Sequence, residues 1–204
     1  MPRPRAKRVL DLVVAASLLL VLSPLVALVL VAFAFDVALV PRDRGRLLYR
    51  EQRISRGRTF ALLKFRTLRS DVLARAAGHA RPLEADSTNL TWLGRRVLKP
   101  WYLDELPQLW NVLRGDISLV GPRPWPPELV ARQRAEGLTY RHDVPAGLTG
   151  LAQLTKGSDR LYADFDLVYI ERSAALGSWG LVLYDFKILA RTVAVMARGQ
   201  GLSY

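Results

Sequence analysis

A long apolar run near the start of the chain limits what this protein can fold into. The run extends from Leu12 to Phe35 and is broken only by Ser17, Ser23 and Pro24. A straight helix of that length would measure about 36 Å, enough to span a bilayer. A cleaved signal peptide would be shorter and would end at a small-residue cleavage site. Since the rest of the sequence could hardly bury such a helix in a soluble core, we predict a membrane helix.

Basic residues stand on both sides of this run. The positive-inside bias therefore favours keeping both of its ends in the cytoplasm. A bent helix that enters and leaves by the same face would satisfy this bias. Pro24 would cause the bend, because it removes a backbone donor and clashes with the preceding turn, and Ser23 could bond a freed carbonyl. The flanking residues are Arg3, Arg5, Lys7 and Arg8 before the run, and Arg42, Arg44, Arg46 and Arg50 after it.

An ordinary spanning helix with a mild kink at Pro24 is the alternative to the bent helix. Asp11 and Asp36 lie at the two edges of the run. We expect interfacial water or a nearby Arg to solvate these two carboxylates.

The composition points to an anionic partner. The chain has 204 residues, with 30 Lys and Arg against 18 Asp and Glu and a formal net charge of +12. Such an excess suits nucleic acid, an anionic membrane surface or phosphorylated substrates. With no Cys and two His, disulfides, thiolate metal sites, cysteine nucleophiles and poly-His metal sites are excluded.

After residue 41 the composition becomes that of a soluble or membrane-surface domain. Clustered Pro residues between 122 and 127 forbid regular structure there, and Gly137 would end a helix that opens at Pro127. The last helix is amphipathic, with an apolar stripe for the core or for a membrane interface. Strands are expected at 47–50 and 59–67, helices at 71–77, 104–113, 127–136, 161–172 and 179–198, and loops at 79–91 and 144–155.

Asp104 and Glu105 are the main candidates for chemistry. They stand where a helix should begin, and carboxylates at such a position commonly serve only as caps. Their surroundings favour a second interpretation, since basic residues lie on both sides and the segment 121–124 forms a rigid turn that presents Arg123. Carboxylates that bind a metal or attack phosphorus, among cations that neutralise phosphoryl oxygens, suit a magnesium–diphosphate substrate. The basic residues are Lys64, Arg66, Arg95, Arg96, Lys99 and Arg123.

The segment that carries these carboxylates resembles the signature of bacterial sugar transferases, the monotopic polyprenyl-phosphate phosphoglycosyl transferases. It reads LDELPQLWNVLRGD over residues 103–116 and continues to GPRP at 121–124. The resemblance covers nearly the whole chain, and its motifs are highly specific. The other matching positions are Lys7–Arg8, Ser23–Pro24, Gln52–Arg53, residues 64–67, the Gly-rich segment 144–153, Tyr169 and residues 185–187.

The resemblance implies a two-step reaction. Asp104 would act as the nucleophile on the β-phosphate of a UDP-sugar, releasing UMP and leaving a phosphosugar on the carboxylate. Polyprenyl phosphate, in bacteria undecaprenyl phosphate, would then take the phosphosugar. Mg²⁺ would assist with Asp104 close to it, and Glu105 would orient the pair or handle a proton. Phosphate and substrate binding falls to Lys64, Arg66, Arg95, Lys99 and Arg123, with Lys99 standing where the family usually has Arg.

The resemblance also implies an α+β fold with a re-entrant membrane helix broken at Ser23 and Pro24. A compact, mainly helical catalytic domain with a few short strands and interfacial amphipathic helices would follow. The division expected is 1–42 for the basic flank and membrane helix and 43–204 for the catalytic domain. The protein would work at the cytoplasmic face of the bacterial inner membrane, with anionic lipids but no nucleic acid as partners; a homodimer is left open. The larger members carry extra transmembrane helices before this core, so the chain looks like a minimal type.

Two departures from the family pattern leave the pair of carboxylates intact. Residues 100–102 read Pro-Trp-Tyr where small or hydroxylated residues are typical, and Pro145 and Ala146 replace a basic-Pro pair. They leave open which sugar is transferred, and they allow a weakened member kept as an assembly partner. A third hypothesis is a membrane-anchored module that binds polyanions. It predicts salt-sensitive binding that Asp104→Asn does not affect.

Overall fold

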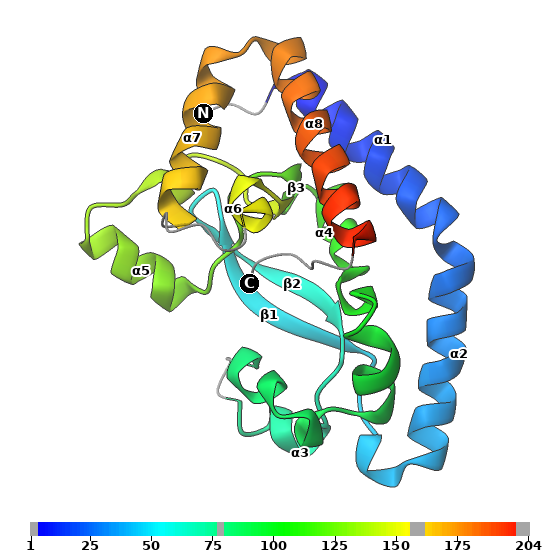
Figure 1. The fold of residues 1–204 in the computed structure, drawn as a ribbon. Helices are drawn as coiled ribbons and strands as arrows, with labels where there is room; N and C mark the ends of the chain where they lie inside the picture. Colours follow the sequence, from blue (N-terminus) through cyan, green and yellow to red (C-terminus); the bar gives the residue numbers. More distant parts are fainter. Residues whose placement is uncertain (1–3, 77–79, 156–161, 199–204) are drawn as a thin grey trace. The chain divides into compact units, whose positions relative to one another are not determined.

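Helices dominate this α+β chain, and the strands are short (Figure 1). The computed structural model describes residues 4–76, 80–155 and 162–198. The helices are α1 (Arg5–Val21), α2 (Ser23–Leu39), α3 (Ser70–Leu73), α4 (Gln108–Arg114), α5 (Pro127–Ala135), α6 (Leu151–Leu154), α7 (Tyr162–Ala175) and α8 (Ser178–Ala197). The strands are β1 (Leu48–Ser55), β2 (Arg58–Phe65), β3 (Ser118–Val120) and β4 (Gly147–Thr149). Short turns of 3₁₀ helix are η1 (Pro41–Asp43), η2 (Arg81–Ala85), η3 (Ser87–Asn89), η5 (Leu103–Glu105) and η6 (Tyr140–His142), and η4 (Gly94–Leu98) is a π-helical turn.

The apolar run is broken where the sequence predicts. Helices α1 and α2 meet at Leu22 with a bend of 56°. Pro24 lies in the first turn of α2, and its missing N–H leaves the carbonyl of Leu20 without its helical donor. The Ser23 hydroxyl donates to that carbonyl at 2.7 Å. Ser23 thus donates a hydrogen bond to the carbonyl that Pro24 leaves without a helical donor, and the predicted break of the helix is confirmed.

The bent pair is apolar on most of its surface. Among the described residues no single helix has the length and apolar composition needed to cross a bilayer, whereas α1 and α2 together do. Leu20, Leu28 and Phe35 expose 76%, 66% and 62% of their surface. A continuous exposed apolar surface of this kind suits lipid rather than water.

The chain forms two compact units. Unit 1 contains the described residues of 1–16, 53–60 and 112–204, and unit 2 those of 17–52 and 61–111. Strands β1 and β2 pair in one two-stranded sheet, and β3 and β4 pair in another. The division predicted at residue 42 stays a prediction.

The core of unit 2 supports the segment that carries the predicted carboxylates. Phe65 of β2 packs with Leu93 and Leu98, and all three are buried. Leu103 and Leu106 pack against this cluster from either side of Asp104 and Glu105. The two apolar residues therefore fix η5, and with it the acidic residues between them, on the core.

A parallel strand pair organises unit 1. Ser118 pairs with Gly147 and Val120 with Thr149. A side chain at Gly147 would place its Cβ 2.1 Å from the backbone nitrogen of Gly121. Glycine is therefore required at Gly147, because the turn after β3 lies directly against β4. Helix α8 packs on both strands.

Helix α1 is bound to unit 1 by a buried polar stripe. Lys7, Asp11 and Ala15 lie one turn apart and are buried. The Asp11 carboxylate accepts from the Ser118 hydroxyl at 2.9 Å and from the Leu119 N–H at 2.8 Å. Interfacial water is therefore the wrong expectation for Asp11 and Asp36, because both are buried. Asp11 is a structural hydrogen-bond acceptor, whereas Asp36 lies within the electrostatic influence of Arg66, the nearby arginine that was the alternative.

Helix α8 presents two different faces. The apolar stripe expected on this helix includes Leu181, Ile188 and Val193. Leu181 and Ile188 are buried, whereas Val193 is 67% exposed. The side chains of an exposed apolar face are Trp179, Leu183, Phe186, Val193 and Met196. This face matches the amphipathic helix expected from the sequence.

The expected strands and long helices are confirmed, with shifted ends. The segment 104–113 is not one helix, because η5 is a separate turn before α4. The segment 144–155 is not all loop, since it contains β4 and α6, and 79–91 contains η2 and η3. Gly137 ends α5 as expected, with φ of +88°. The sequence does not predict strand β3, because a segment of three residues is too short to leave a periodic signal.

Candidate active site

Asp104 and Glu105 occupy a single 3₁₀ turn ahead of α4. Tyr102 precedes this turn in the left-handed conformation, with φ of +54°. A β-carbon is strained there, so the chain reverses direction sharply at Tyr102. The reversal and the partly buried leucines on either side hold Asp104 with 3% of its surface exposed, while Glu105 stays half-buried.

Lys99 is the cation nearest to Asp104. Its Nζ lies 3.6 Å from Asp104 Oδ2 and 2.5 Å from Glu84 Oε2. Lys99 directly follows the π-helical turn η4, and its N–H bonds to the carbonyl of Gly94 at 3.0 Å. Turns of this type commonly occur at functional sites, because they redirect a side chain without ending the helix.

Lys64 approaches the other carboxylate. Its Nζ lies 3.6 Å from Glu105 Oε1, and both side chains are largely buried. Asn111 of α4 fixes the strand that carries Lys64, because its amide accepts from the Leu63 N–H at 3.0 Å and donates to the Ala61 carbonyl at 2.9 Å. The helix that follows the carboxylates is therefore bonded directly to the strand that supplies the lysine.

The environment changes the acid–base properties of this cluster. Burial raises the pKa of Asp104 to about 6, Lys99 opposes the shift, and the charge of Glu105 adds to it. Burial alone would lower the pKa of Lys99, but the charges of Asp104 and Glu84 outweigh it and the pKa is raised. At neutral pH the site thus holds an ionised carboxylate that is poorly solvated, beside a lysine that stays protonated.

Glu84 is a member of the cluster that sequence reasoning missed. It lies in η2 and accepts from Lys99 and, at 3.2 Å, from the Thr67 hydroxyl. Thr67 belongs to the same motif as Lys64, and its hydroxyl needs a hydrogen-bond partner. That need is the one signal in the sequence that could have pointed to Glu84. Glu84 lies in the polar segment 79–91, which the sequence predicts to be a solvated loop.

The remaining basic candidates are placed differently. Arg66 is buried and donates to the backbone carbonyls of Arg46, Leu68 and Asp43. Its guanidinium is thus used to join backbone segments. Arg95 is an exposed side chain on η4. Arg123 belongs to unit 1, on the turn after β3, where its carbonyl accepts from Arg141 at 2.5 Å.

The structure therefore brings together four of the predicted residues and adds one. The cluster of unit 2 consists of Lys64, Lys99, Asp104, Glu105 and the additional Glu84. Asp104 is the residue that could hold a metal together with a substrate. Among the described residues no group of three His, Cys, Asp or Glu side chains could hold a metal ion.

Comparisons with known proteins cover nearly the whole chain. A family model described as bacterial sugar transferase matches residues 3–199. A UDP-galactose-lipid carrier transferase of Erwinia amylovora is 36% identical over 211 residues, which are 96% of this chain and 41% of that protein. The exopolysaccharide production protein ExoY of Sinorhizobium fredii is 32% identical over 212 residues, 96% of this chain and 87% of the relative.

A third relative is named for the reaction that it catalyses. It is the UDP-glucose:undecaprenyl-phosphate glucose-1-phosphate transferase of Caulobacter vibrioides, which is 36% identical over 215 residues, 94% of this chain and 72% of the relative. The chain thus spans less than half the length of the Erwinia relative and most of the length of the other two.

Proposed function

Because the chain belongs to the bacterial sugar transferase family, we propose that it transfers a sugar-1-phosphate from a UDP-sugar to undecaprenyl phosphate and releases UMP. This step would initiate a lipid-linked glycan such as an exopolysaccharide, capsule, O-antigen or glycoprotein glycan. The observation that carries the proposal is the state of Asp104. Its carboxylate is buried and lies 3.6 Å from Lys99, and no described residue donates a hydrogen bond to it. Its lone pairs are therefore available to attack phosphorus.

In the first step Asp104 acts as the nucleophile. One carboxylate oxygen bonds to the phosphorus that carries the sugar, and the bond from that phosphorus to the bridging oxygen breaks. The electron pair leaves with UMP, and an acyl phosphate now joins Asp104 to the sugar. Lys99 stands close enough to neutralise the phosphoryl oxygens, and burial of Asp104 makes its carboxylate a stronger nucleophile than a hydrated one.

In the second step an oxygen of undecaprenyl phosphate attacks the same phosphorus. The acyl phosphate bond breaks, and its electron pair restores the Asp104 carboxylate. A covalent intermediate lets the soluble donor and the lipid acceptor bind in turn rather than together. Glu105 orients Lys64, whose Nζ lies 3.6 Å from Glu105 Oε1, and Lys64 is the cation of this cluster proposed to bind phosphate.

The residues present fit Mg²⁺ shared with the substrate. This ion usually keeps several waters and is held by one or two carboxylates plus substrate phosphates. An Asp104 carboxylate with open lone pairs and a diphosphate would provide such a set. When bound, Mg²⁺ would supply positive charge that neutralises phosphoryl oxygens. Removal of divalent ions with EDTA is expected to abolish UMP release, and adding Mg²⁺ back should restore it.

The exposed apolar surfaces support a site at the membrane. Trp101 and Trp110 stand on either side of the carboxylates in the sequence and expose 73% and 55% of their surface. Tryptophan is enriched at the membrane–water interface. Together with the bent pair of α1 and α2, this supports a re-entrant helix and a catalytic domain at the cytoplasmic face of the inner membrane, held against anionic lipids by the charge of +12.

The experiment that tests the function is UMP release from a panel of UDP-sugars. The purified chain in detergent, with Mg²⁺ and undecaprenyl phosphate, is expected to release UMP with at least one sugar. Asp104→Asn should reduce this release by roughly 1,000-fold or more. The panel should begin with UDP-glucose and UDP-galactose, which the names of two relatives contain.

The alternatives give different results in the same assay. A non-catalytic assembly partner would bind the nucleotide sugar without releasing UMP. A polyanion-binding module would bind acidic vesicles in a salt-sensitive manner, equally well in wild type and Asp104→Asn, and would release no UMP. Either pattern would contradict the proposed transfer.

A further inference from the structure

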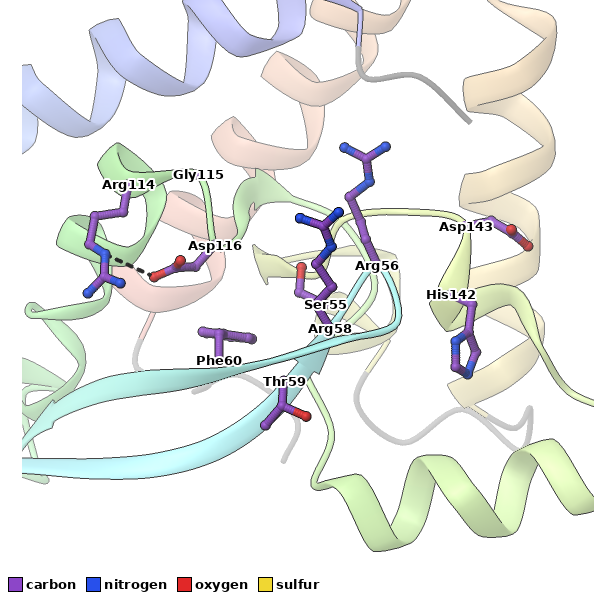
Figure 2. A pocket seen from close by; sticks show the side chains of 10 residues that line it. All are labelled: Ser55, Arg56, Arg58, Thr59, Phe60, Arg114, Gly115, Asp116, His142 and Asp143. Carbon is purple, nitrogen blue, oxygen red and sulfur yellow. Dashed lines mark ion pairs between the residues drawn. The ribbon is translucent and has the colours of Figure 1, made fainter.

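A cavity of about 540 Å³ lies in unit 1 at the tip of the β1–β2 hairpin (Figure 2). Sites for small molecules usually have volumes of roughly 300–1,000 Å³. Three segments line the cavity: the hairpin tip, the connection from α4 to β3, and the end of η6. The proposed reaction makes no use of these residues.

The hairpin tip is held in a fixed shape. Arg56 and Gly57 form its turn, with φ of +51° and +70°. The Gly57 N–H donates to the carbonyl of Arg141 at 3.3 Å, and a β-carbon at Gly57 would lie 2.7 Å from His142 Nδ1. The tip is therefore docked on η6, so the side chains around it are positioned before any ligand arrives.

Cations dominate the wall of this cavity. Arg56 and Arg58 come from the hairpin and Arg114 from the end of α4, while Asp116 and Asp143 carry the opposing charge. Arg114 Nε lies 3.5 Å from Asp116 Oδ2, and Figure 2 shows this pair on one side of the cavity. Three guanidinium groups around one space match the oxygens of a phosphate better than they match a single carboxylate.

The rest of the lining favours a ligand with hydroxyl groups. Ser55 and Thr59 offer hydroxyls, and Phe60 offers an apolar wall. His142 contributes an imidazole to the same wall. The two Asp side chains can accept hydrogen bonds but would repel a bare polyanion. We therefore propose that this cavity binds a phosphate ester that also carries hydroxyl groups.

Two sources would supply such a ligand: the glycerol headgroup of an anionic phospholipid, or the ribose phosphate of a nucleotide. The position of Arg8 makes the lipid relevant, because its guanidinium donates to the carbonyls of Val112 and Leu113 at 2.6 Å each. A β-carbon at Gly115, on the cavity wall, would lie 3.4 Å from Arg8. The cavity thus adjoins the first turns of α1, where the proposed membrane helix begins.

The test uses the full chain in detergent and three probes: glycerol 1-phosphate, UMP and short-chain phosphatidylglycerol. Dissociation constants are measured by calorimetry for wild type and for Arg58→Gln and Arg114→Gln, which are separate changes at exposed side chains. Arg134→Gln on α5 is the matched control, since it removes an exposed arginine that does not line the cavity. Lys64→Gln reports binding at the proposed active site instead.

At least one probe is expected to bind wild type and Arg134→Gln equally, and to bind Arg58→Gln and Arg114→Gln about tenfold more weakly or worse. Lys64→Gln should leave the binding of glycerol 1-phosphate and of the lipid unchanged, and should weaken only UMP that binds at the proposed active site. Preference for the lipid over UMP, or the reverse, identifies the source. The proposal is overturned if no probe binds, if Arg58→Gln and Arg114→Gln bind like wild type, or if only Lys64→Gln loses binding. Since UMP release is not measured, failure here leaves the proposed transfer standing.

Discussion

Each unit contains a lysine beside a buried aspartate, and the two clusters differ in how the carboxylate is hydrogen-bonded. In unit 1, Lys7 pairs with Asp185, and these side chains expose 4% and 1% of their surface. Lys7 also donates to the carbonyl of Val120 and to the Tyr169 hydroxyl, each at 3.0 Å. The same Tyr169 hydroxyl donates to the second oxygen of Asp185 at 2.9 Å.

In unit 2 the corresponding pair is looser. Lys99 is 30% exposed and lies 3.6 Å from Asp104, beyond hydrogen-bonding distance. No described residue donates a hydrogen bond to the Asp104 carboxylate. A buried charge without such bonds is costly, so its retention indicates a use. Residue types alone therefore do not distinguish a structural ion pair from one that is available for chemistry. The hydrogen bonds that the carboxylate accepts do distinguish them.

The largest effect on stability is expected in the cluster of Lys7 and Asp185 in unit 1. Lys7→Met leaves Asp185 buried without its cation and should reduce the free energy of unfolding by about 3–5 kcal/mol. Replacing both members, in Lys7→Met with Asp185→Leu, should recover much of that loss, because a buried pair is often replaceable by apolar residues. Thermal unfolding in detergent measures both. Equal stability of wild type and Lys7→Met would show that the pair is not structural.

A change of stability in the opposite direction is expected for Asp104, the proposed nucleophile. Burial raises the pKa of Asp104 from 3.8 to about 6, with Lys99 opposing the shift. An acid with a raised pKa in the folded state destabilises the fold when ionised, by as much as about 3 kcal/mol above pH 6. Asp104→Asn removes this cost, so the variant should unfold later than wild type at pH 7–8 and lose its advantage near pH 4.

The control for this gain is Asp164→Asn, an exposed aspartate in the first turn of α7. It should change stability by a few tenths of a kcal/mol and in the destabilising direction, because a negative charge at a helix start is favourable. A variant Asp104→Asn that is less stable than wild type at pH 8 would mean that the carboxylate is a structural group after all.

The pH dependence of turnover should report the same ionisation. The nucleophile must be charged, so kcat/KM is expected to rise about tenfold per pH unit below pH 6 and to level off above it. A pH-rate profile between pH 5 and 8, with protein stability checked at each end, measures this. A profile that stays flat down to pH 5 would show that Asp104 is solvated like an ordinary carboxylate.

The smallest effect is expected at Glu84. Glu84→Gln removes one anchor of Lys99 and one negative charge that raises the pKa of Asp104. Turnover at pH 8 should fall by about tenfold or less, and the acid limb should move to lower pH. Glu136→Gln, at an exposed position after α5, is the control and should move neither quantity. Loss of turnover without movement of the acid limb would mean that Glu84 does not act through Lys99 and Asp104.

Local signals in the sequence predicted the parts of the site that depend on neighbouring residues. Pro24 and Ser23 specify the helix break, because the freed carbonyl lies one turn before them. The motif around Asp104 identified the carboxylates, and Lys64 and Lys99 were found as the surrounding cations. These features need no knowledge of how distant segments meet.

Long-range contacts could not be predicted in the same way. Strand β3 is three residues long, and its parallel partner β4 follows only after α5 and η6. In the sequence Lys7 is one of several basic residues before the apolar run. Its partner in the structure, Asp185, lies 178 positions later in the chain. Glu84 gave no sign of burial, because a carboxylate in a polar segment usually stays in water. The burial of Asp11 depends on Ser118 and Leu119, more than 100 positions later in the chain.

Trapping the covalent intermediate is the most direct test of Asp104 as nucleophile. The chain is incubated with Mg²⁺ and the UDP-sugar that supports turnover, without undecaprenyl phosphate, and is then quenched and analysed by intact and peptide mass spectrometry. We expect a mass increase equal to one phosphosugar on the peptide that contains Asp104, absent in Asp104→Asn and removed when undecaprenyl phosphate is added. Turnover with no modified protein, or modification at another residue, would contradict the assignment.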